Sequence, residues 1–103
     1  MVIYVDIDGT ICNNPPITEG EFPNYALATP ISENIDKINK LYNIGHQVVY
    51  WTARGSKSGH QWFDLTIKQL KEWGAKFHEL RMGKPPYNLI ICDKSIKIED
   101  LKV

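Results

Sequence analysis

The feature that most constrains this chain is an apolar run leading directly into two acidic residues, Val2-Ile3-Tyr4-Val5-Asp6-Ile7-Asp8-Gly9-Thr10. A continuous apolar run is typical of a strand buried on both faces, as in a parallel sheet covered by helices. Such sheets bind ligands just beyond the carboxyl ends of their strands. Asp6 and Asp8 are two apart on an extended chain, so their side chains point the same way. Neighbouring carboxylates repel each other unless a cation or proton lies between them, which favours a divalent metal. The rival interpretation is an edge turn in which Asp and Gly are ordinary turn formers.

Composition sets limits on the class of protein. The 103 residues predict a single domain over 1–103, and the apolar fraction of 43% is ordinary for a globular chain. Twelve basic and twelve acidic residues cancel, so no global field attracts nucleic acid or an anionic membrane. No stretch approaches the ~20 apolar residues of a membrane span. The chain start lacks the pattern of a signal peptide, so we expect a cytoplasmic protein.

The remaining segments follow in a clear order. Residues 11–29 are rich in Asn, Pro, Gly and Thr and predict a long loop or flap, with a short hairpin around Glu19-Gly20-Glu21. Thr29 as N-cap and Pro30 at the first helical position predict a helix that ends before Gly45. Further elements are expected in this order: a strand over 47–51, a helix over 61–73, strands over 76–80 and 88–92, and a helical turn within 95–101.

Strands that alternate with helices imply right-handed parallel crossovers. We therefore predict an α/β chain with a three-layer Rossmann-like fold. Its mostly parallel sheet would have four to five strands in the order 4-1-2-3, with helices on both faces and no cap domain. Three of the expected strands end at a polar reactive side chain: Asp6 with Asp8, Thr52, and Asp93. One functional edge of a single sheet explains this placement.

These residues carry a resemblance to a known family. Asp6-Ile7-Asp8-Gly9-Thr10 is similar to the first motif of the haloacid dehalogenase-like (HAD) phosphatases. Thr52, Lys84 and Asp93 match the second, third and fourth motifs in order and in position at strand ends or loops. The chain thus resembles a small, capless HAD phosphatase over nearly its whole length. The fourth motif departs from the pattern, because many members carry a second acid where this chain has Cys92 or Lys97.

The resemblance implies a role for each matched residue. Asp6 and Asp93 would bind Mg²⁺ through their carboxylates and Asp8 through its backbone carbonyl. Asp6 would also attack phosphorus, and Asp8 would act as general acid and base. Thr52 would bind a phosphoryl oxygen and Lys84 would neutralise charge. Backbone N–H groups at three positions would complete the phosphate site: Ile7, Gly9 and Ala53. Taken singly, Thr52 or Asp93 could be a turn former and Lys84 a solvated loop lysine.

The substrate is left open between several alternatives. Arg54 follows Thr52 closely and is a candidate substrate-binding residue, with a plain surface charge as the alternative. Compact capless relatives with similar Trp-Thr-Ala-Arg and Gly-Lys-Pro segments are associated with capsule and lipopolysaccharide sugar synthesis, which favours a small phosphorylated sugar or related metabolite. Residues 54–59 also resemble the phosphatase domain of phage polynucleotide kinase, although neutral charge makes nucleic acid the weaker candidate. A third hypothesis is a non-catalytic HAD-like binding or assembly module. The missing cap also predicts a homo-oligomer.

Overall fold

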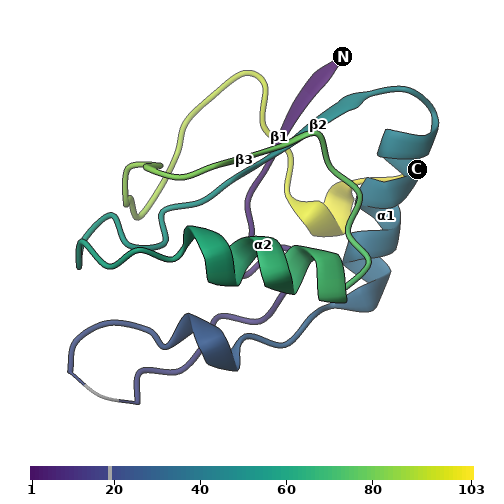
Figure 1. Cartoon of the computed structure of the whole chain (residues 1–103). Coiled ribbons are helices and arrows are strands. Elements are labelled where there is room, and N and C mark those ends of the chain that lie inside the picture. The colour runs from purple at the N-terminus through teal and green to yellow at the C-terminus, as the bar shows by residue number, and fades with distance from the viewer. Residues whose placement is uncertain (19) are drawn as a thin grey trace.

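The computed structural model describes residues 1–18 and 20–103, so the hairpin expected around Glu19-Gly20-Glu21 lies partly outside the described residues. Its centre is a parallel three-stranded sheet in the order β1-β2-β3 (Figure 1). The strands are β1 (Val2–Val5), β2 (Gln47–Trp51) and β3 (Glu79–Arg81). Two α-helices connect them, α1 (Ser32–Asn43) and α2 (Phe63–Glu72). Two short 3₁₀ helices complete the chain, η1 (Tyr25–Leu27) and η2 (Ile98–Asp100).

Both helices pack on the same face of the sheet. Val48 and Tyr50 alternate along β2 and therefore point to one face. They share a single core with Ile35 and Ile38 of α1 and with Leu70 of α2. The physical reason is the strand order: two right-handed crossovers that step in the same direction place their helices on the same side. The predicted three-layer arrangement is therefore wrong, and the fold has one helical layer on one sheet.

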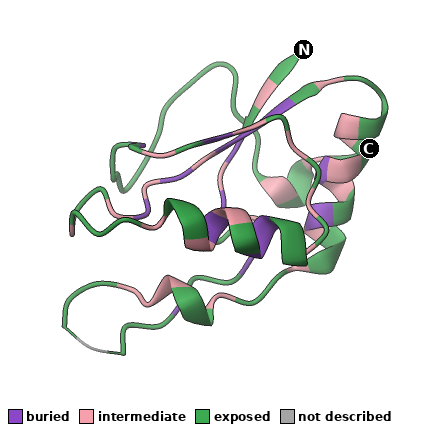
Figure 2. Cartoon of the chain, viewed as in Figure 1, coloured by how far each residue is buried: buried purple, intermediate pink, exposed green. Residues whose placement is uncertain are grey.

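The predicted fourth strand is also wrong. The segment from Asn88 to Cys92 pairs with no described strand, and Leu89 and Ile91 are 75% and 91% exposed. Figure 2 shows the same exposure along the surrounding segment, in which residues 85–97 are all exposed. A parallel crossover needs a dozen or more residues, whereas only residues 82–87 separate β3 from this segment. The four- to five-stranded sheet and the order 4-1-2-3 are overturned by the same finding.

Smaller differences concern the ends of elements. Helix α1 begins at Ser32 with no side-chain cap, and not at Pro30. Thr29, the expected N-cap, donates its backbone N–H to Asn13 Oδ1 at 2.7 Å. At the other end of the chain, the expected helical turn is η2, which packs Ile98 on the core. No helix among the described residues is long and apolar enough to cross a membrane.

Candidate functional site

A cavity of about 300 Å³ lies beyond the carboxyl ends of β1 and β2. Its walls come from three loops, and prolines and tyrosines make up much of them. Six residues that the sequence singled out line this cavity together: Asp6, Asp8, Thr52, Ala53, Arg54 and Lys84. They lie at one edge because parallel strands bring the residues that follow them to the same end of the sheet.

Asp6 faces Lys84 across this cavity. Lys84 Nζ lies 3.5 Å from Asp6 Oδ1, and the two side chains are 10% and 41% exposed, respectively. The rings of Trp51 and Tyr87 lie 5.6 and 5.1 Å from the same ammonium. The Lys84 backbone N–H donates to the Thr52 carbonyl at 3.1 Å, which fixes the lysine at the end of β2. A buried cation therefore stands beside a carboxylate that solvent and ligands can reach.

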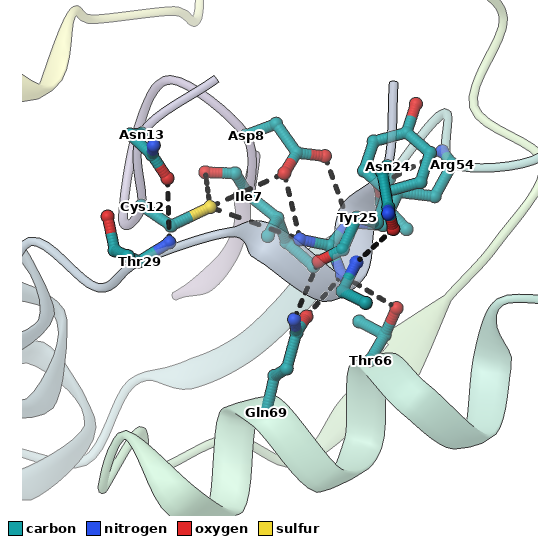
Figure 3. A network of polar contacts seen from close by, with 12 residues as sticks. Ile7, Asp8, Cys12, Asn13, Asn24, Tyr25, Thr29, Arg54, Thr66 and Gln69 are labelled. Carbon is teal, nitrogen blue, oxygen red and sulfur yellow. Dashed lines mark hydrogen bonds and ion pairs between the residues drawn. The ribbon is translucent and has the colours of Figure 1, made fainter. Parts of the chain in front are cut away.

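Asp8 forms the tighter ion pair of the site, with Arg54 (Figure 3). Arg54 Nε donates to Asp8 Oδ2 at 2.9 Å and Nη2 donates to Oδ1 at 2.8 Å, a bidentate arrangement. The arginine side chain is completely buried, while that of Asp8 is 18% exposed. A guanidinium on this scale of burial needs such partners, because an unpaired buried charge is costly.

The remaining Arg54 donors reach helix α2 and Cys12. Nη1 donates to Thr66 Oγ1 at 3.0 Å and to Gln69 Oε1 at 2.6 Å. Nη2 also lies 4.0 Å from Cys12 Sγ. A guanidinium has five N–H donors, and these contacts with Asp8 use all of them. A substrate oxygen would have to displace one, so the role of Arg54 in substrate binding stays a prediction.

Sequence reasoning overlooked the part played by Gln69. Its Nε2 donates to the backbone carbonyl of Tyr25 at 2.7 Å, which connects α2 to η1. The Tyr25 ring lies 4.8 Å from the Arg54 guanidinium carbon and lines the cavity. The available signal was a threonine and a glutamine three residues apart in the stripe of α2 that carries Leu70, since buried polar groups need partners.

Cys12 belongs to the same network. Its thiol is fully buried and lies 3.3 Å from Asp8 Oδ1 and 3.6 Å from the Ile7 carbonyl oxygen. Burial, followed by the neighbouring Asp8 carboxylate, raises the pKa of the Cys12 thiol to about 12. The thiol therefore keeps its proton at neutral pH and donates it to Asp8, which is the opposite of a reactive thiolate.

Other predicted site residues lie elsewhere or are already engaged. Asp93 is exposed and does not line the cavity. Ile7 is fully buried, and the Gly9 N–H donates to the Cys12 carbonyl at 2.9 Å. Over residues 1–18 and 20–103, no three His, Cys, Asp or Glu side chains gather in a group that could hold a metal ion. The role of Asp93 as a metal ligand stays a prediction.

Comparisons with known proteins give a fold but no family. No family model matches the chain, and the search of curated proteins finds no similar sequence. A crystal structure of a structural genomics target from Vibrio cholerae is similar in fold, with a TM-score of 0.80. It is 20% identical in sequence, and the alignment covers 97% of this chain and 86% of that chain. At this identity the likeness concerns the fold alone.

Proposed function

We propose that the cavity hydrolyses phosphate monoesters, with Asp6 as the nucleophile. The observation that carries this proposal is the half-exposed Asp6 carboxylate beside the buried Lys84 ammonium, with Thr52 on the same wall. A phosphate monoester is an anion, so an attacking carboxylate must have positive charge beside it. Lys84 supplies that charge at a fixed place, and Asp6 is accessible enough to meet a phosphorus atom.

The reaction would proceed in two displacements. First, an Asp6 oxygen bonds to phosphorus, the ester P–O bond breaks, and the leaving oxygen takes up a proton. Water then bonds to phosphorus, gives up a proton, and releases Asp6 together with inorganic phosphate. Both Asp8 oxygens already accept hydrogen bonds from Arg54, an arrangement suited to receiving the proton of that water.

Mg²⁺ is the cofactor we propose. It prefers oxygen ligands and is commonly bound through one or two carboxylates together with substrate phosphate oxygens and water. The exposed Asp6 carboxylate fits that mode of binding, and the Asp8 backbone carbonyl and Asp93 are the further ligands that the resemblance implies. When bound, the ion would supply positive charge beside the phosphoryl oxygens.

A small phosphorylated sugar or related metabolite is the proposed substrate. The cavity of about 300 Å³ suits a small molecule. Its two cations, Lys84 and Arg54, are each matched by a carboxylate, which leaves no surplus positive charge for a polyanion. We place the reaction in the cytoplasm. We also propose a homo-oligomer, supported by exposed Leu89 and Ile91, and light scattering that gave a monomer mass would contradict it.

A non-catalytic binding module is the second candidate. The observation that favours it is the position of Asp93, which is exposed outside the cavity. Without that carboxylate, the cavity would still bind an anion through Lys84 but would lack part of the predicted metal site. The two candidates differ in turnover.

Phosphate release from an aryl phosphate, with and without Mg²⁺, tests the proposal. We expect metal-dependent turnover by the wild type and a loss of about 10⁴-fold or more in Asp6→Asn. Asp36→Asn makes the same change at an exposed position of α1 and should be unaffected. Asp93→Asn tests that ligand separately. A panel of sugar phosphates and a 3′-phosphorylated oligonucleotide should then show preference for the former. Failure to turn over any of these, with intact anion binding, would favour the binding module.

A further inference from the structure

Gln69 joins two parts of the site that are far apart in the sequence. Its side chain is 6% exposed and uses both ends of its amide. Oε1 accepts from Arg54 Nη1 at 2.6 Å, and Nε2 donates to the Tyr25 carbonyl at 2.7 Å (Figure 3). The opposite orientation of the amide would set its NH₂ against the guanidinium and its oxygen against the carbonyl. The two partners therefore fix the amide in one orientation.

The Tyr25 ring depends on this contact. Helix η1 has only three residues and no buried side chain of its own. Its Tyr25 ring lies over the Arg54 guanidinium at 4.8 Å and meets the Trp62 ring edge to face at 5.2 Å. An element so short gains little from its own hydrogen bonds, so contacts with α2 must hold it in place. The hydrogen bond from Gln69 is such a contact.

We propose that Gln69 is a positioning residue that anchors η1 and thereby holds Tyr25 as a wall of the cavity above the Asp8–Arg54 ion pair. The covering ring keeps water from the guanidinium, which strengthens the ion pair that orients Asp8. Resting on the proposed function, the same contact sets how tightly a phosphate ester is held, because Tyr25 lines the cavity beside Asp6.

Two variants of α2 separate the anchor from the support of Arg54. Gln69→Glu keeps an acceptor for Arg54 but loses the N–H that donates to the Tyr25 carbonyl. Thr66→Val loses the neighbouring acceptor of the same Arg54 nitrogen at 3.0 Å and leaves the Tyr25 contact intact. If Gln69→Glu does not fold, Gln69→Met has a similar size and carries neither amide group.

The measurement is amide hydrogen exchange of Leu27 and Ala28, whose N–H groups bond within η1 to Asn24 and Tyr25. We expect exchange to accelerate by about tenfold or more in Gln69→Glu, the loss of one hydrogen bond, and by less than about threefold in Thr66→Val. Equal effects of the two variants, or no effect of either Gln69 variant, would overturn the proposal.

A kinetic measurement adds a readout that mere structural support would not move. With an aryl phosphate as substrate, Gln69→Glu should raise KM more than it lowers kcat, since the wall and not the nucleophile is disturbed. A fall in kcat at constant KM would contradict the assigned role. The exchange experiment needs no turnover, so it tests the anchor even if the proposed phosphatase activity fails.

Discussion

The strongest energetic prediction concerns the ion pair between Asp8 and Arg54. Arg54 is completely buried, and its two hydrogen bonds to Asp8 measure 2.8 and 2.9 Å. Asp8→Asn leaves the guanidinium without a counter-charge, which costs about 3–5 kcal/mol when a buried pair loses one partner. Arg54→Met leaves Asp8 without its cation and should cost a similar amount. Because a domain has only about 5–15 kcal/mol in total, either variant should be markedly less stable.

The double variant distinguishes coupling from independent effects. Asp8→Asn with Arg54→Met removes both charges, so its cost should be smaller than the sum of the single costs by about 2 kcal/mol or more. Arg54→Lys keeps the charge but cannot donate in a bidentate manner, and its cost should lie between those of the wild type and Arg54→Met. Equilibrium unfolding in urea at neutral pH, followed by tryptophan fluorescence, gives the four free energies of unfolding.

The chain supplies its own control for this cycle. Lys68 and Glu72 lie 3.9 Å apart on α2, with side chains 72% and 59% exposed. The cycle of Lys68→Met and Glu72→Gln should show a coupling energy below about 0.5 kcal/mol, because water screens an exposed pair. If the costs at Asp8 and Arg54 add to within about 0.5 kcal/mol, the argument from burial is refuted.

Two further predictions concern Gly55 and Cys12. A Cβ at Gly55 would lie 2.3 Å from the His60 carbonyl oxygen, so Gly55→Ala should destabilise the protein by clearly more than Gly59→Ala, as measured by thermal unfolding. Both residues have positive φ, but a Cβ at Gly59 meets no atom within 4 Å, so comparable losses would contradict the clash. Because the pKa of Cys12 is raised on folding from 9.0 to about 12, the folded protein retains a proton that the unfolded chain releases. The stability due to this thiol is complete below pH 9 and is lost as pH rises toward 12, by up to about 1.4 kcal/mol per pH unit. Unfolding in urea across this range should show a shallower fall for Cys12→Ala, and equal slopes would refute the assignment.

Local patterns predict the parts of this fold that local physics controls. The strands β1 and β2 lie on the apolar runs that end at Asp6 and Thr52, because such runs bury well in a parallel sheet. Since parallel strands end at one edge, the sequence could also indicate that these residues lie near each other. Lys84 reaches the same cavity through its backbone bond to Thr52.

Apolar character alone misleads where chain connectivity decides the structure. The run from Asn88 to Cys92 has the composition of a buried strand, yet it follows β3 too closely for a parallel crossover. That limit could have been applied to the sequence from the spacing and from Pro85 and Pro86. The second error, helices on both faces, has the same origin, because the third layer depended on the absent strand.

The polar network could be predicted only in part because its partners are distant in sequence. Thr66 and Gln69 lie on the buried stripe of α2, which signals that each needs a polar partner. The sequence does not say that both partners would meet at Arg54, or that Tyr25 would close the network from another loop. Such contacts are set by the packing of α2 against the sheet and not by any local pattern.

The two ion pairs of the cavity differ in ways that suit different tasks. Arg54 and Asp8 are held by short bidentate bonds at 0% and 18% exposure, so exchanging either partner for a ligand would cost the network its buried hydrogen bonds. Lys84 and Asp6 stand farther apart, at 3.5 Å, with Asp6 41% exposed. An anion can therefore share Lys84 with Asp6 at little cost, because water already solvates that carboxylate in part. The rigid pair is the framework of the site, and the looser pair is the place where a phosphate group would compete and react.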